Sequence, residues 1–274
     1  MAVASPPPIP PPLSGASPQA IYATNLGVRY SLRFTKKTTI RQSLGQIFAR
    51  ENAEPFWALR NVSFRLVRGE SLAVIGPNGA GKSTLLQVLA GIILPSEGTV
   101  EVNGHVSSLL TLGAGFDQEL SGRENILLAG AFMGLDDALV RELLPAIVEY
   151  ADIGQFIDTP IKTYSAGMRA RLGFAIATSV DPDILLLDEV LATGDAEFRT
   201  KSKTRVIELT QAAKGIVLVT HDMAWVEEYC NRAILLEKGE VVVEGDPAEV
   251  VRTHIERSAA RKAERAARLG SAAI

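Results

Sequence analysis

The segment Ser71–Thr84, with the sequence SLAVIGPNGAGKST, decides the fold class of this chain. A short apolar run typical of a buried strand leads into a glycine-rich turn, and a helix is predicted from Lys82. In that arrangement, backbone N–H groups can close around phosphate oxygens, while a lysine neutralises the β- and γ-oxygens. Ser83 can offer its hydroxyl to Mg²⁺. The predicted phosphate-binding loop consists of Gly76, Pro77, Asn78, Gly79, Ala80, Gly81, Lys82, Ser83 and Thr84.

A second apolar run, Ile184–Leu187, ends in two acidic residues, Asp188 and Glu189. Because the carboxyl ends of parallel strands meet at one edge of a sheet, we expect Asp188 to approach the loop, although it follows Lys82 by 106 residues. Asp188 is predicted to hold Mg²⁺ through water, and Glu189 to polarise the attacking water. His221 follows the apolar run GIVLVT at the same edge and is predicted to donate to the γ-phosphate.

The rest of the chain alternates predicted strands and helices from Val62 onward. Strands are expected near Ala23–Tyr30 and at Ile184–Leu187, Ile216–Thr220 and Ala233–Leu236. Residues 121–179 are mostly helical, and Ser121 with Glu124 forms a predicted capping box. This pattern predicts an α/β domain with a parallel-core sheet and a helical insertion. The chain has no N-K-x-D guanine-reading motif, which favours ATP over GTP.

Composition narrows the class of protein. The 274 residues carry a net charge of −3, so there is no overall basic character for nucleic acid. The single cysteine, Cys230, cannot form an internal disulfide and suits a reducing compartment. No secretory leader and no apolar run of membrane-spanning length is visible. We therefore expect a soluble, cytosolic chain.

Three segments lie outside the expected α/β pattern. Residues 1–20 are rich in proline and alanine and are predicted to form a disordered tail. An insertion over about residues 31–56 contains a predicted amphipathic helix, Thr39–Arg50, whose pattern is typical of an ordinary surface helix. Residues 251–274 form a predicted basic helical tail, since residues 252–268 carry six Arg or Lys against two Glu. This tail is either simply solvated or attracted to an anionic membrane leaflet.

The segment TYSAGMR, residues 163–169, links these motifs to a family. With the loop and Asp188–Glu189 already identified, it resembles the signature motif of ABC-type ATPases, usually Leu-Ser-Gly-Gly-Gln. Ser165 and Gly167 match that motif, while Ala166 and Met168 replace its second Gly and its Gln. The resemblance implies that Ser165 and Gly167 contact ATP bound by a second subunit, so that a homodimer encloses two ATP molecules.

Longer stretches resemble one branch of that family, the ATP-binding subunits of polysaccharide exporters. They are LLTLGAGFDQELSGRENI, TYSAGMRARLGFAIA and DEVLATGDAEF. The resemblance implies an ABC-type ATP-binding domain over residues 21–250, with an antiparallel β subdomain and a helical subdomain at about 118–178. It also implies a multi-span permease partner that handles most of the lipid-linked glycan. The helix Thr39–Arg50 is similar to an insertion that these subunits carry near the membrane, which is the alternative to an ordinary surface helix. The expected location is the cytoplasmic face of the inner membrane, and Asp195 would lie across the dimer interface.

Several alternatives stay open. Tyr30 and Trp57 are candidates for stacking on adenine, with Phe56 equally near, and each is alternatively a core residue. The family's Q-loop glutamine has no clear counterpart, because Gln118 falls several residues late. The other functions considered are export of drugs or simple lipids and ATP-driven work on DNA. Nucleic acid is not an expected partner, because the 106-residue spacing leaves no room for the long inserts of DNA-handling relatives.

Overall fold

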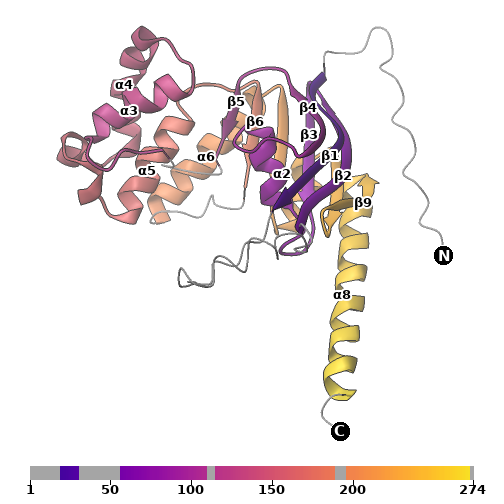
Figure 1. Cartoon of the computed structure of the whole chain (residues 1–274). Helices are drawn as coiled ribbons and strands as arrows, with labels where there is room; N and C mark the ends of the chain where they lie inside the picture. Colours follow the sequence, from indigo (N-terminus) through magenta and orange to yellow (C-terminus); the bar gives the residue numbers. More distant parts are fainter. Residues whose placement is uncertain (1–18, 31–55, 110–114, 189–195, 272–274) are drawn as a thin grey trace, which may run out of the picture.

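A computed structural model describes residues 19–30, 56–109, 115–188 and 196–271, and these form two sheets and a set of helices (Figure 1). The smaller sheet is antiparallel, with the order β2-β1-β4. The larger sheet has the order β5-β6-β7-β3-β8-β9; all neighbours are parallel except β8 and β9. The strands are β1 (Gln19–Tyr30), β2 (Phe56–Val67), β3 (Glu70–Ile75), β4 (Glu97–Val102), β5 (Val106–Ser108), β6 (Ile184–Leu187), β7 (Gly215–Val219), β8 (Arg232–Glu237) and β9 (Glu240–Gly245).

The parallel strands are buried on both faces. In β6, Ile184 and Leu186 join the core cluster that contains α2 (Lys82–Leu89). Leu185 and Leu187 join the cluster on the other face of the sheet. Side chains alternate across a strand, so a wholly apolar strand fits a sheet with a core on each side. Helix α2 packs between the two sheets, which holds the loop preceding it at the carboxyl edge of β3.

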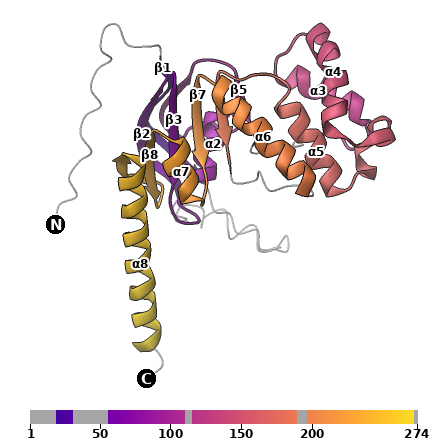
Figure 2. The same ribbon diagram turned by 180° about the vertical axis from the view of Figure 1, so that it is seen from behind.

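The opposite face of the larger sheet is covered by three further helices, as the reversed view shows (Figure 2). They are α6 (Ala196–Ala212), α7 (Met223–Tyr229) and α8 (Pro247–Ser271). Val250 and Val251 anchor the first turn of α8 in this core. The remainder of α8 extends away from the sheets (Figure 1).

A helical subdomain lies to one side of the sheets (Figure 1). It contains α3 (Gly122–Phe132), α4 (Asp137–Ala151), α5 (Ala166–Ala177) and two short 3₁₀ turns, Gly154–Asp158 and Ile161–Thr163, around a core of its own. The capping box is confirmed, because the Ser121 side chain accepts from the Glu124 N–H and the Glu124 carboxylate accepts from the Ser121 N–H. Buried Asn125 ties the preceding loop to α3 through the backbone of Asp117, with which it exchanges two hydrogen bonds.

The structure confirms the parallel core, the antiparallel sheet and the helical subdomain. It moves one boundary, because β1 begins at Gln19 and Ala20 is buried, so these two residues do not belong to the tail. Residues 1–18 and the predicted helix Thr39–Arg50 lie outside the described residues. Within the described ranges, no helix is both long enough and apolar enough to cross a membrane.

Candidate functional site

The glycine-rich loop joins β3 to α2 in a conformation that ordinary residues rarely adopt. Gly76, Gly79 and Gly81 have φ values of +150°, +76° and +106°. Gly81 is the N-cap of α2 and supplies no side-chain cap, whereas a Ser or Asp side chain caps α3, α4, α5 and α7. Helix α2 therefore begins without a side-chain cap, and anionic oxygen is the acceptor that a helix N-terminus favours.

Lys82 folds back over this loop. Its Nζ donates to the carbonyl oxygens of Gly76 at 2.7 Å and Pro77 at 3.1 Å, and the residue is only 8% exposed. Hydrogen bonds from an ammonium to anionic phosphate oxygens are stronger than those to neutral carbonyls. The lysine is thus held against the loop, and a phosphate in the cavity that both line would offer it stronger partners.

One cavity of about 420 Å³ collects most of the predicted nucleotide site. Its wall includes Asn78 to Thr84 of the loop together with Asp188 and His221. The pairing register explains this, since Leu187 of β6 is level with Leu218 of β7, and Val219 of β7 is level with Val74 of β3. Asp188 and His221 therefore emerge at the same sheet edge as the loop, as predicted. Glu189, the predicted water-polarising residue, lies outside the described residues, as does Asp195.

Two of the three aromatic candidates line this cavity. Tyr30 and Phe56 line the cavity and are cross-strand partners in the β1–β2 pair. Trp57 does not line it, because successive side chains of a strand point to opposite faces. Instead, Trp57 lies against Gly27 with the Arg60 guanidinium 5.8 Å from its ring centroid. An adenine ring entering this cavity would meet Tyr30 or Phe56.

The Ser165 turn lies in a different cavity. Ser165 caps α5, its Oγ accepting from the Met168 N–H at 3.1 Å. A hydroxyl that accepts one hydrogen bond keeps its own hydrogen to donate, so Ser165 remains able to bind an anion. Beside it, the surface at Gly167 is open, since a Cβ there would meet only the Ser165 Oγ at 3.7 Å. Ser165, Gly167 and Arg171 line a cavity of about 600 Å³ that shares no lining residue with the loop cavity.

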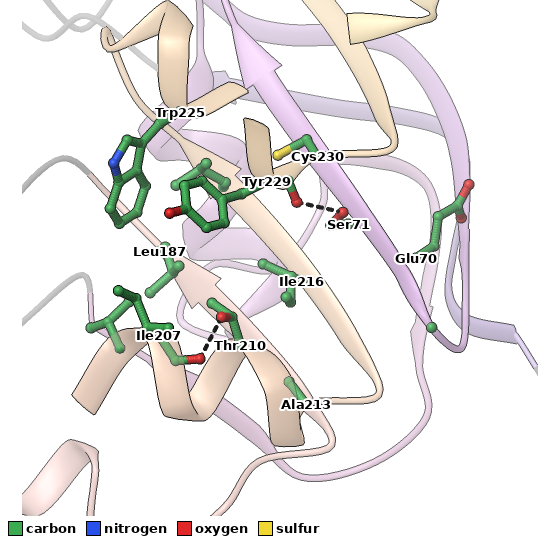
Figure 3. A pocket seen from close by; sticks show the side chains of 13 residues that line it. Glu70, Ser71, Leu187, Ile207, Thr210, Ala213, Ile216, Trp225, Tyr229 and Cys230 are labelled. Carbon is green, nitrogen blue, oxygen red and sulfur yellow. Dashed lines mark hydrogen bonds between the residues drawn. The ribbon is translucent and has the colours of Figure 1, made fainter. Parts of the chain in front are cut away.

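A further cavity, of about 200 Å³, lies between α6, α7 and the sheet and does not suit phosphate (Figure 3). Two of its three hydroxyl groups already donate within the protein, Ser71 to the Tyr229 carbonyl and Thr210 to the Ile207 carbonyl, and the third is the phenol of Tyr229. Burial raises the pKa of the Cys230 thiol to about 12, so that group is neutral at physiological pH. No Lys, Arg or His lines it among the residues that the structure describes.

Comparison with known proteins agrees with this geometry. A family model described as ABC transporter matches residues 59–192, which include the loop, the Ser165 turn and Asp188. The O-antigen export system ATP-binding protein RfbB of Klebsiella pneumoniae is 44% identical over 182 residues, covering 66% of this chain and 74% of that protein. The chain belongs to the ABC transporter ATP-binding family.

Other members of the ABC family are longer. RfbB of Myxococcus xanthus is 44% identical over 210 residues, covering 77% of this chain and 48% of its own length. The teichoic acids export ATP-binding protein TagH of Lactococcus lactis is 46% identical over 201 residues, covering 73% of this chain and 43% of its own length. The chain thus spans less than half the length of these two relatives.

Solved structures share the ABC fold at low sequence identity. The ATP-binding subunit of an ABC transporter superposes with a TM-score of 0.65 at 23% identity, covering 85% of this chain and 92% of that one. The ATP-binding cassette MJ0796, described as a dimer bound to ADP and Pi, has a TM-score of 0.62 at 21% identity and covers 83% of this chain and 98% of its own. At these identities, the comparison establishes the fold alone.

Proposed function

We propose that this chain is the ATP-hydrolysing motor subunit of an ABC exporter for a lipid-linked polysaccharide. One observation carries the proposal: the loop, Asp188 and His221 share one cavity, while the Ser165 turn faces another. A chain that carries both halves of an ATP site in separate places can complete the site by pairing with a second copy. The relatives named for O-antigen and teichoic acid export support the substrate class.

The polar and aromatic residues of the loop cavity have proposed tasks. The loop N–H groups and Lys82 bind the phosphates of ATP, and Tyr30 or Phe56 stacks on the base. Ser83 and Asp188 present oxygen atoms, the ligands that Mg²⁺ prefers, and both line this cavity, so they fit that cation. When bound, Mg²⁺ would neutralise charge on the β- and γ-phosphates.

Hydrolysis is assigned to two further residues. Glu189 follows Asp188 directly and polarises the attacking water as a general base. His221 donates a hydrogen bond to the γ-phosphate from the turn between β7 and α7. In that turn, the Thr220 hydroxyl accepts from the Asp222 N–H, and the Asp222 carboxylate caps α7, which fixes the backbone on either side of His221.

The proposed partners follow from the separation of the loop cavity from the Ser165 turn. A second copy supplies Ser165 and Gly167 to each ATP, and the dimer closes and opens with ATP binding and hydrolysis. The motion is delivered to a multi-span permease, which handles most of the glycan. The chain would then be a peripheral protein at the cytoplasmic face of the cell membrane, with no nucleic acid partner.

The alternative is an exporter of drugs or simple lipids, which uses the same ATP site. Only the cargo distinguishes the two, and the names of the relatives favour the polysaccharide. Purification of the chain from native membranes, with identification of any multi-span protein bound to it, tests the transporter assignment. Recovery of DNA in place of such a protein would overturn it.

Replacement of Glu189 tests the enzymatic assignment. Glu189→Gln should bind ATP as the wild type does but hydrolyse it at least about a hundredfold more slowly, because the amide cannot act as a base. The trapped ATP-bound form should elute as a dimer in size-exclusion chromatography. Lys82→Ala is the matched control and should weaken ATP binding itself. Wild-type turnover in Glu189→Gln would remove that residue from its assigned task.

A further inference from the structure

The two-residue turn between β8 and β9 supports the phosphate-binding loop. Lys238 and Gly239 have φ values of +50° and +82°, as in the type I′ turns of tight hairpins. The Gly239 N–H donates to the Ala80 carbonyl oxygen at 2.9 Å, and the Gly239 carbonyl oxygen accepts from the Arg60 N–H at 2.8 Å. The turn is therefore hydrogen-bonded to the loop on one side and to β2 on the other.

Steric contacts fix this position further. A Cβ at Gly239 would lie 2.7 Å from the carbonyl oxygen of Ala58, and a Cβ at Gly76 would overlap the carbonyl oxygen of Leu236. Real Cβ atoms do not approach backbone so closely, so both glycines are held where only glycine fits. The end of the β8–β9 hairpin thus touches the loop at two points, near its start and near its end.

Glu237, the residue before the turn, connects it to α8. Its carboxylate is 11% exposed on the side chain and accepts from Arg257 at 2.9 and 3.2 Å and from Arg261 at 2.6 Å. The two arginines are one helical turn apart, so they present a paired cationic surface. Hydrogen bonding from Arg257 is the main cause that lowers the pKa of Glu237, with Arg261 adding to it against the effect of burial.

The base of α8 also lies within electrostatic reach of the nucleotide cavity. His254 has a buried Nδ1 without a hydrogen-bond partner. Burial is the main cause that lowers the pKa of His254, and the charges of Arg261, Lys82 and His221 lower it further while Glu237 raises it. Two of the groups that act on His254, Lys82 and His221, line the nucleotide cavity.

We propose that Glu237 is a positioning residue that clamps α8 to the turn supporting the phosphate-binding loop, so that ATP affinity and the placement of α8 are coupled. Glu237 does not line the cavity; it acts through the Lys238–Gly239 turn. The inference rests on the proposed binding of ATP at the loop. Such coupling is reciprocal. If displacement of α8 weakens ATP binding by a given factor, ATP binding makes that displacement less favourable by the same factor.

The first experiment measures ATP affinity by titration calorimetry on the full chain. Glu237→Gln should bind ATP about tenfold more weakly, within the usual range of coupling between sites. The variant Arg257→Gln/Arg261→Gln should lose a similar factor, and combining all three changes should lose no more, because they break one clamp. Arg252→Gln, an exposed arginine of the same helix, is the control and should bind normally. Affinities within twofold of the wild type, or effects that simply add, would overturn the proposal.

A second readout separates coupling from a merely structural role. The chain has three histidines, so the His254 ring signal can be identified by NMR after replacing His105 and, separately, His221. ATP should shift the His254 signal in the wild type and much less in Glu237→Gln. A lowered melting temperature with an unchanged ATP-dependent shift would mean that Glu237 is structural only, against the proposal. If the wild type binds no ATP, the proposed function fails; if it binds and Glu237→Gln binds equally, only this inference fails.

Discussion

Two glycines of the phosphate-binding loop have different reasons to be glycine. Gly76 is buried, and a methyl group there would overlap the Leu236 carbonyl oxygen. Gly79 is exposed at φ +76°, and a methyl group there would meet nothing within 4 Å. The first position is restricted by its neighbours, and the second only by its backbone conformation.

Substitution of these two glycines by alanine should therefore have unequal effects. Gly76→Ala should shift the loop or β8, lowering the melting temperature and abolishing ATP binding. Gly79→Ala should cost about 1–2 kcal/mol of left-handed backbone strain and leave ATP binding largely intact. Thermal unfolding and ATP titration of both variants check this, and equal losses at the two positions would contradict it.

At the residue scale, the sequence was sufficient to predict which polar residues meet in the loop cavity, but not which aromatic residue beside Tyr30 lines it. Loop residues, Asp188 and His221 carry their chemistry in their type and in their place at strand ends, and the structure brings them to one cavity. Trp57 does not line that cavity, whereas Phe56 does, because neighbouring strand residues face opposite ways. Only the register that pairs Phe56 with Tyr30 decides between them, and that register links segments on either side of residues 31–55.

At the scale of elements, the pairing of β8 with α8 predicts a dependence of stability on pH. A carboxyl whose pKa is lowered by folding stabilises the folded state above its unfolded pKa of about 4.5, and this contribution is lost as pH falls through the folded pKa. Urea unfolding of the wild type should therefore show stability falling below about pH 4.5, and Glu237→Gln should show a shallower fall over that window.

The control for this pH series is Glu256→Gln, an exposed glutamate of the same helix. It should follow the wild-type curve. Identical slopes for the wild type and Glu237→Gln would mean that the ion pair with Arg257 and Arg261 contributes nothing to folding stability.

The strands were predictable from the sequence where both faces of the strand are buried. The strand Ile184–Leu187 matches the prediction, since an all-apolar run needs no knowledge of its partner. The first strand begins at Gln19 rather than near Ala23, because its early residues are defined by pairing with Arg65–Val67. Its alternation is also interrupted by Asn25, at φ +50°, beside a shift in register.

At the scale of the whole molecule, the Ser165 turn is expected to act on the nucleotide of a partner. Ser165→Arg should leave ATP affinity of the single chain unchanged and stop turnover, because the change lies outside the loop cavity. In a mixed dimer of a Ser165→Arg chain and a Lys82→Ala chain, one ATP site combines the altered loop with the altered Ser165 turn. The other site combines an unaltered loop with an unaltered turn. Partial recovery of hydrolysis on mixing is the expected result; weaker ATP binding by Ser165→Arg alone would contradict it.

The arrangement of layers followed from the alternation of strands and helices, and the separate helical subdomain from the long helical stretch with its capping box. The clamp of Glu237 on α8 could not be predicted. It joins a strand end to arginines 20 and 24 residues later, and in the sequence those arginines read only as part of a basic tail.

The separation of the loop cavity from the Ser165 turn also has a kinetic meaning. An enzyme whose active site is complete in one chain shows a rate proportional to its concentration. If each site is completed by two chains, as we propose, initial hydrolysis at low concentration should rise with the square of the protein concentration and become linear only once most chains are paired. Joining two copies in tandem with a long flexible linker should remove the quadratic regime, because each chain then carries its partner with it.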